Sequence, residues 1–172
     1  MKKAKPSKSK KKKPLSPEER AKRNLQRRHR REIRETFTSV GFERVDTATD
    51  KEFTFDGVTS DFDDVFVLEN VVVFAEYTTR SEVSEHAKKK YLMYDRIRKS
   101  EAAFIAFARG APLGIGAKLA PKYSNHQIKV VLLYCSLQNV QVELKEQINQ
   151  ALFMDYSVVR YFRLLTKTVR QS

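Results

Sequence analysis

The chain has 172 residues, and its 34 Lys and Arg side chains outnumber its 21 Asp and Glu side chains by 13. The whole excess lies in residues 1–31, which carry 15 basic and two acidic side chains, whereas residues 32–172 carry 19 of each. The apolar runs are far shorter than the roughly 18 residues of a membrane span, so no membrane segment is expected. A single cysteine, Cys135, excludes an internal disulfide and favours an intracellular location, cytoplasmic or, in a eukaryotic cell, nuclear.

The N-terminal part of the chain is a cationic leader on a neutral body. Residues 1–16 are rich in Lys, Ser and Pro and have almost nothing to bury, which predicts a disordered cationic tail. Residues 17–172 have the size and composition of a single domain with one core. We therefore expect one α/β domain that opens with an Arg-rich helix behind a flexible tail.

The expected first helix runs from residue 17 to residue 40. Ser16 can cap it and Glu19 completes a capping box, while Gly41 is a natural stop. Its first half is nearly all charge, whereas its second half carries apolar side chains at helical spacing. Only the second half is therefore expected to pack on a core.

The remaining pattern alternates between strands and helices. Period-two and β-branched runs predict strands, and longer amphipathic runs predict helices. The expected strands are 53–55, 63–68, 71–78, 128–136 and 152–154, and the expected helices are 82–108, 140–149 and 157–168. The order helix, three strands, helix, strand, helix, strand, helix predicts a mixed α/β fold.

Two acidic side chains are expected to meet on one hairpin. A two-residue turn at Glu69-Asn70 places Asp63 directly across from Glu76 on the same sheet face, with Cβ atoms about 4.5–5.5 Å apart. Like charges so placed repel each other, unless a hard divalent cation such as Mg²⁺ binds both carboxylates. The alternative is a solvated strand entry, which explains Asp63 better than it explains Glu76, because Glu76 follows five apolar residues.

The spacing of Asp63 and Glu76-Tyr77-Thr78 at two strand ends resembles the PD-(D/E)xK superfamily of restriction-endonuclease-like nucleases, in the style of its Holliday-junction-resolvase and Mrr-like branches. Gly57 and Asp61-Phe62-Asp63 correspond to the Gly-Glu-x-Asp strand of those branches, and the similarity covers roughly residues 30–108. The resemblance implies an αβββαβ core with a mixed central sheet flanked by helices, here followed by a C-terminal helix. It also implies phosphodiester hydrolysis by a metal-activated water, with Mg²⁺ or Mn²⁺ held by Asp63 and Glu76.

The same resemblance points to an acidic residue on the preceding helix. Family members often carry one about nine positions before a Gly-aromatic pair, and Glu32 lies nine residues before Gly41-Phe42. Glu32 would be a further metal ligand or would orient the water, with Glu35 as the second choice.

The chain departs from the family pattern at Thr78, where the family has a catalytic Lys. Threonine cannot supply the positive charge that steadies the transition state. In some similar nucleases the Lys has moved to the following helix, and Lys89 or Lys88 would then take its role. Otherwise the chain is a catalytically degenerate member that binds nucleic acid or a partner without cutting.

The leader is expected to bind nucleic acid through phosphate contacts. Lys and Arg give affinity without sequence readout, and no Phe, Tyr or Trp in residues 1–31 offers base stacking. A targeting or solubilising tail and an anionic surface are the alternatives. The residues expected to contact phosphate are Lys10, Lys11, Lys12, Lys13, Arg27, Arg28, Arg30 and Arg31.

Two functions of different class follow from the sequence. The first is a metal-dependent DNA endonuclease, a hydrolase that acts on DNA or another nucleic acid. The second is a non-catalytic binding or assembly module on the same fold. Thr78 separates the two, and the sequence leaves open whether the chain works as a homodimer or beside a partner protein.

Overall fold

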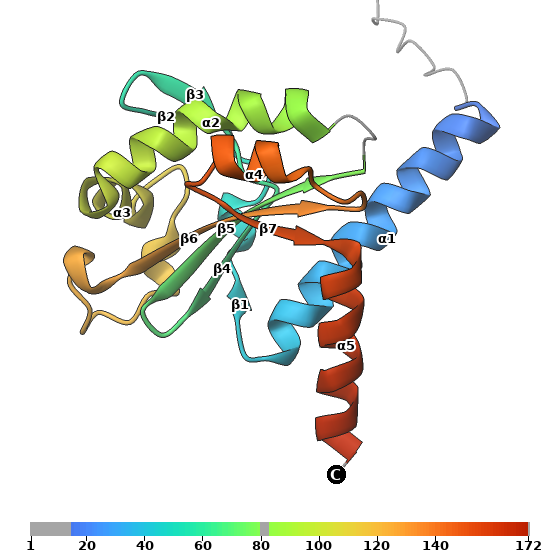
Figure 1. Cartoon of the computed structure of the whole chain (residues 1–172). Coiled ribbons are helices and arrows are strands. Elements are labelled where there is room, and N and C mark those ends of the chain that lie inside the picture. Colours follow the sequence, from blue (N-terminus) through green and yellow to red (C-terminus); the bar gives the residue numbers. More distant parts are fainter. Residues whose placement is uncertain (1–14, 80–82, 172) are drawn as a thin grey trace, which may run out of the picture.

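The chain forms a five-stranded sheet with helices on both faces, and the computed structural model describes residues 15–79 and 83–171 (Figure 1). The expected tail therefore lies outside the described residues except for Leu15 and Ser16. The helices are α1 (Pro17–Ser39), α2 (Val83–Lys99), α3 (Glu101–Arg109), α4 (Val142–Gln147) and α5 (Tyr156–Gln171). The strands are β1 (Glu43–Arg44), β2 (Phe53–Phe55), β3 (Val58–Ser60), β4 (Asp64–Leu68), β5 (Val71–Thr78), β6 (Lys129–Ser136) and β7 (Leu152–Asp155).

The main sheet is mixed, as predicted, and has the strand order β1-β4-β5-β6-β7. β1 and β4 pair antiparallel, as do β4 and β5, which form a hairpin. β5, β6 and β7 pair parallel, because the chain crosses over through α2 and α3 and then through α4. The β4–β5 hairpin has the predicted register, with Leu68 opposite Val71 and Asp64 opposite Ala75.

Two apolar clusters pack on the two faces of the sheet. Alternate residues of β5 point to opposite faces, since strand side chains have a period of two. The face with Val72 and Phe74 packs against α2, α3 and α4. The face with Val73 and Ala75 packs against α1 and α5. No helix in residues 15–79 and 83–171 is long and apolar enough to cross a membrane.

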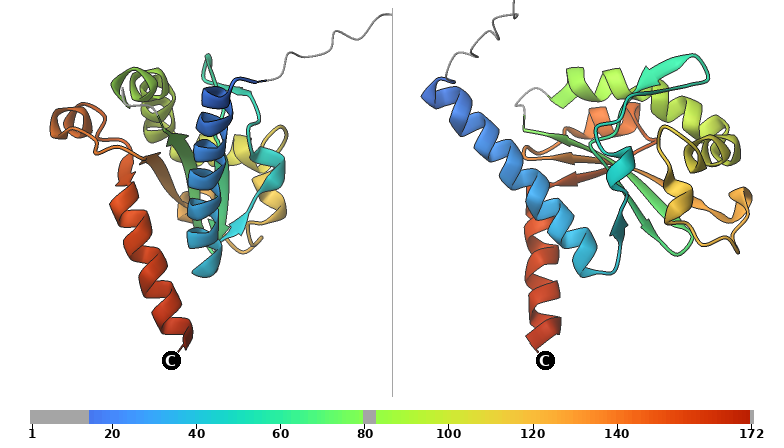
Figure 2. Two further views of the ribbon diagram at one scale, coloured as in Figure 1. Left: turned by 90° about the vertical axis from the view of Figure 1, so that its right-hand side faces the viewer. Right: turned by 180° about the vertical axis from the view of Figure 1, so that it is seen from behind.

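Helix α1 extends beyond the body with its first half, as predicted (Figures 1 and 2). Its start has the expected capping box, in which the Ser16 hydroxyl accepts from the Glu19 N–H and the Glu19 carboxylate accepts from the Ser16 N–H. Residues 16–28 are exposed, and the first buried side chain is His29. The basic half of the helix is therefore surrounded by solvent and the second half packs on the sheet.

The strand predicted at residues 53–55 forms, but it lies outside the main sheet. It pairs with β3 in a separate two-stranded hairpin whose turn contains Asp56 and Gly57, both with positive φ. The rings of Phe53 and Phe55 pack against Phe104 of α3. The aromatic residues thus fix the hairpin to the core, and the two-residue strand β1 takes the outer place in the main sheet.

The helix predicted over residues 82–108 is divided at Ser100 into α2 and α3. Ser100 has a non-helical backbone, with φ −147° and ψ 49°. The break lets both segments bury their apolar faces, which include Tyr94 and Ile97 on α2 and Phe104 on α3, against the same side of the sheet.

The carboxylate of Asp64 is fully buried between α1 and β1. It accepts from Arg34 at 2.7 Å and 3.0 Å, from Arg44 Nε at 2.5 Å and from the Thr49 hydroxyl at 3.2 Å. Both arginines are about 30% exposed. The buried charge is therefore compensated by two guanidinium groups from different elements, which connect α1 and β1 to β4.

We expect the Asp64→Ala variant to lose about 3–5 kcal/mol of unfolding free energy, because it leaves two arginines without their shared partner. Asp46→Ala is the matched control, since Asp46 also pairs with Arg44 but its side chain is 78% exposed. Its expected cost is below about 1 kcal/mol. Urea unfolding of both variants measures the difference, and equal losses would contradict the structural role of Asp64.

Candidate active site

The hairpin register brings Asp63 and Glu76 to the same end of the sheet. Asp63 directly precedes β4, whose last pair with β5 is Asp64 opposite Ala75, so Asp63 lies one position beyond the ladder, next to Glu76. The Asp63 carboxylate accepts from the Tyr77 N–H at 2.8 Å. This hydrogen bond fixes the Asp63 carboxylate at the end of β5.

Glu76 is almost completely buried, with 2% of its surface exposed, and forms an ion pair with Lys90. The Lys90 ammonium lies 2.7 Å from Glu76 Oε1 and 2.6 Å from Asp61 Oδ1, and it also donates to the Asp61 carbonyl at 2.8 Å. Burial would lower the pKa of Lys90, but Glu76 and Asp61 outweigh it and raise that pKa. Lys90 is therefore a fixed positive charge beside Glu76.

Asp63 is compensated from the other side, by Arg30 of α1. The Arg30 guanidinium contacts Asp63 Oδ1 and also binds both oxygens of Asp50 at 2.9 Å. Burial would lower the pKa of Arg30, but Asp50 and Asp63 more than offset it and raise that pKa. The two acids at the hairpin end thus carry one cation each, from α1 and from α2.

These side chains line one cavity of about 550 Å³ between α1 and the ends of β4 and β5. Arg23, Arg27 and Arg30 lie on its α1 side at helical spacing, which places them on one face of the helix. The other lining residues are Gln26, His29, Asp61, Asp63, Glu76, Tyr77, Thr78, Thr79 and Lys90. The cavity therefore has acids at its base and guanidinium groups along one wall.

Two of the predicted site residues, Glu32 and Lys88, lie away from the cavity. Glu32 lines a different pocket and pairs with Arg28 at 3.0 Å and with Arg163 at 3.1 Å, so the structure does not bring it to Asp63 and Glu76. Lys88 is exposed, and the side chain of Lys89 lies outside the described residues. The lysine that reaches Glu76 is the third of the run, Lys90.

The predicted phosphate contacts of the leader are divided among several places. Arg27 and Arg30 line the cavity, whereas Arg28 faces Glu32 and Arg31 lies 3.7 Å from Glu35. Lys10, Lys11, Lys12 and Lys13 lie outside the described residues. Arg23 and Arg27 are exposed and flank the opening of the cavity.

His29 is a second feature that the sequence did not identify. It is 1% exposed, lines the cavity and makes edge contacts with the rings of Tyr77 and Tyr156, at centroid distances of 6.1 Å and 6.3 Å. Burial lowers its pKa, against raising contributions from the Cys135 backbone and from the charges of Glu32 and Asp63. Burial therefore favours the neutral form of the His29 imidazole in the folded protein.

The hairpin end offers two carboxylates, the type of ligand that binds a hard divalent cation. Asp63 and Glu76 supply carboxylate oxygens in one cavity, and both already face a cationic group, Arg30 or Lys90. Mg²⁺ is commonly held by one or two carboxylates together with waters and substrate phosphates. Within residues 15–79 and 83–171, no group of three or more His, Cys, Asp and Glu side chains is arranged to hold a metal ion, at this site or elsewhere.

Sequence periodicity could have identified Lys90 and His29. Lys90 lies three residues after Ala87 and seven before Ile97, on the stripe of α2 that is buried. His29 lies four residues before Ile33, on the buried stripe of α1. In each helix a polar side chain on the buried stripe, His29 or Lys90, lines the cavity.

Comparisons of the chain with protein-family models, with curated proteins and with solved structures gave no match.

We expect the stability of the protein to fall as the pH drops from about 7.5 to 5.5, in part because of His29. The pKa of His29 is below its ordinary 6.5 in the folded state, so below that pH the unfolded chain binds a proton that the folded chain does not. His29→Phe removes this contribution and should lose less stability over the same range. Urea unfolding at pH 7.5 and pH 5.5 measures the loss of unfolding free energy in both proteins.

The matched control is His126→Phe, since His126 is exposed. It should keep the pH dependence of the unchanged protein. If His29→Phe lost as much stability between the two pH values as the unchanged protein does, His29 would have the same pKa in the folded and unfolded chains, which would contradict the prediction.

Proposed function

We propose that the chain is a metal-dependent phosphodiesterase that cuts DNA, with Asp63, Glu76 and Lys90 as its central residues. The observation that carries the proposal is the ion pair of Lys90 with buried Glu76, next to Asp63 in a cavity walled by arginines. Two carboxylates and one lysine are the functional groups that the PD-(D/E)xK resemblance implies. Here the lysine comes from α2, and Thr78 occupies its usual place on the strand.

The arrangement of elements supports the same proposal. α1, the antiparallel strands β1, β4 and β5, the crossover through α2 and the parallel strand β6 follow the αβββαβ order that the resemblance implies. The hairpin β2–β3 is then an insertion between the first and second strands of that core.

Each residue of the site has a distinct role in the proposal. Asp63 and Glu76 would hold Mg²⁺ or Mn²⁺, which when bound lowers the pKa of water and stabilises negative charge on a phosphoryl oxygen. Lys90 orients Glu76 through their 2.7 Å contact and keeps a positive charge at the base of the cavity. The Tyr77 N–H orients Asp63.

The guanidinium groups on α1 would bind the substrate backbone. Arg23 and Arg27 lie on one face of an exposed helix half at the opening of the cavity, so they can neutralise phosphates that flank the scissile one. Arg30 binds both oxygens of Asp50 in addition to contacting Asp63. DNA is thus the proposed partner. The arginines of α1 would reduce the repulsion between its phosphates and the carboxylates of the cavity.

A second function, nucleic-acid binding without cleavage, is favoured by the charge balance of the acids. Glu76 faces Lys90 and Asp63 faces Arg30, so both carboxylates are compensated by protein side chains. A module of this kind would bind DNA in the presence of metal and leave it intact. The cleavage assay below separates the two functions.

Supercoiled plasmid and branched DNA should be cleaved in the presence of Mg²⁺ or Mn²⁺ and stay intact with a chelator. Glu76→Gln and Asp63→Asn should abolish cleavage, because each removes one anionic oxygen ligand. Lys90→Gln should lower the rate about 10²- to 10³-fold, the usual effect of removing one group that stabilises developing charge. Lys99→Gln is the matched control on α2, since Lys99 is exposed and pairs with Asp95.

The double variant Lys90→Thr, Thr78→Lys returns the lysine to the strand and should recover part of the activity. Binding without metal-dependent cleavage would favour the second function. Activity that persists unchanged in Glu76→Gln would reject the first.

DNA affinity should fall steeply with salt, and the variant Arg23→Gln, Arg27→Gln should reduce the slope of log K against log salt by about two, because each phosphate contact contributes about 0.9. Arg96→Gln, Lys99→Gln on α2 removes the same charge elsewhere and should keep the slope. Fluorescence anisotropy with a labelled duplex measures both. An unchanged slope in the α1 variant would exclude these arginines from the binding surface.

A further inference from the structure

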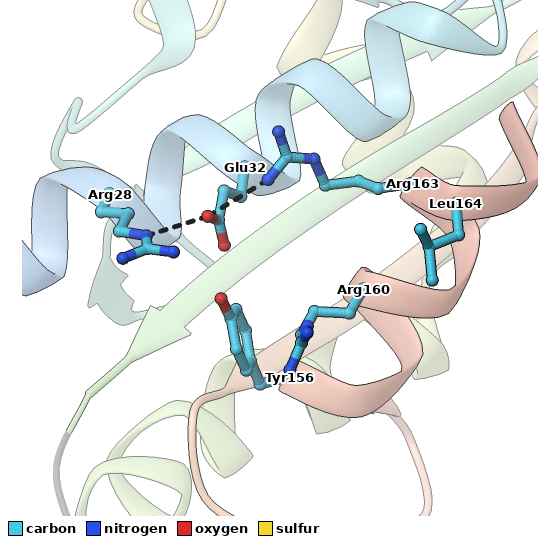
Figure 3. A pocket seen from close by; sticks show the side chains of 6 residues that line it. All are labelled: Arg28, Glu32, Tyr156, Arg160, Arg163 and Leu164. Atoms are coloured by element: carbon cyan, nitrogen blue, oxygen red, sulfur yellow. Dashed lines mark hydrogen bonds and ion pairs between the residues drawn. The ribbon is translucent and has the colours of Figure 1, made fainter. Parts of the chain in front are cut away.

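A second basic cavity lies on the other side of α1, between α1 and α5 (Figure 3). Its volume is about 330 Å³. Three of its six lining residues are arginines, Arg28 from α1 and Arg160 and Arg163 from α5, and the others are Glu32, Tyr156 and Leu164. None of the functions above uses this cavity.

The cavity has an excess of positive charge. Three guanidinium groups surround one carboxylate, which leaves a net charge of +2 in the lining. Glu32 stays ionised, since its pKa is lowered: burial would raise it, but Arg28, Tyr156 and Arg163 outweigh burial. The lining is therefore cationic at any pH near neutrality and attracts an anion.

Glu32 holds two of the arginines in place. Its Oε1 atom lies 3.0 Å from Arg28 Nε and 3.1 Å from Arg163 Nη1. Arg163 is fixed further by Glu35, 3.0 Å from its Nη2 atom. Two side chains that would otherwise lose rotamer freedom on binding are thus oriented beforehand, which lowers the cost of binding.

Arg160 supplies the charge that no acid balances. The structure shows no ion pair for Arg160 with any described acidic residue, and its guanidinium lies 6.0 Å from the centre of the Tyr156 ring. Arg28 donates to Glu32 from its Nε atom. In Figure 3 both side chains border the cavity together with the Tyr156 hydroxyl, which points toward Glu32.

We propose that the cavity between α1 and α5 is a binding site for a phosphate group of a nucleic acid, separate from the group that is cut. Guanidinium groups match phosphate oxygens in planar, two-point hydrogen bonds and provide more charge than a carboxylate needs. A net charge of +2 balances a terminal phosphate fully and a backbone phosphate with one charge to spare.

The position of the cavity relates it to the candidate active site. Arg28 and His29 are neighbours on α1, and Arg28 lines the phosphate cavity while His29 lines the cavity with Asp63 and Glu76. A smaller pocket that includes both residues lies between the two. A nucleic acid that crosses α1 can therefore place one phosphate on each side of the helix.

The test is calorimetric titration of the full chain with inorganic pyrophosphate in the presence of a chelator. Arg160→Gln should weaken binding about tenfold, as expected for the loss of one charge-assisted contact of roughly 1.4 kcal/mol. Arg160→Lys keeps the charge but not the planar contact, so its loss should be smaller. Arg96→Gln on α2 is the matched control, and urea unfolding checks that all variants are folded.

Two oligonucleotides of one sequence, with a 5′-phosphate or a 5′-hydroxyl, distinguish the source of the phosphate. A larger effect of Arg160→Gln on the phosphorylated strand identifies a terminal phosphate, and an equal effect on both identifies a backbone phosphate. No effect on either strand rejects nucleic acid as the ligand.

Equal pyrophosphate affinities of Arg160→Gln and Arg96→Gln overturn the site itself. Neither result depends on cleavage, so the proposed nuclease activity is tested separately.

Discussion

The acidic side chains at the adjoining ends of β4 and β5 have to be neutralised, and cations from three different elements, α1, β1 and α2, do so. Asp64 binds Arg34 of α1 and Arg44 of β1, Asp63 contacts Arg30 of α1, and Glu76 pairs with Lys90 of α2. Loss of one partner from a buried pair costs several kcal/mol, whereas the intact pair adds little net stability. These contacts therefore connect α1, β1 and α2 to the hairpin and add little net stability of their own.

The site on the hairpin could be predicted because its geometry is local. The two-residue turn fixes the register of β4 and β5, and that register brings Asp63 to the end of the sheet that carries Glu76. The fold class followed from the alternation of strands and helices for the same reason. The two-residue strand β1 has no pattern of its own, and it forms because the chain after α1 passes beside β4.

The rest of the site depends on contacts between distant segments. Three consecutive lysines look alike in the sequence, and only the packing of α2 turns Lys90 toward Glu76 and leaves Lys88 in solvent. Glu32 has the sequence position of a ligand, but it faces α5, whose Arg163 the local pattern of α1 does not include. A motif spacing thus predicts which elements meet, and the helix stripe decides which side chain enters the cavity.

The element that carries the lysine determines which part of the structure fixes its position. A lysine at position 78 would lie on the same strand face as Glu76, two residues or about 6.6–6.8 Å away, and the strand alone would fix it. Lys90 instead depends on how α2 packs, through Ala87, Tyr94 and Ile97, which are fully buried against the sheet. The charge beside Glu76 is therefore placed by the apolar core, so that the core and the chemistry of the site share the same helix.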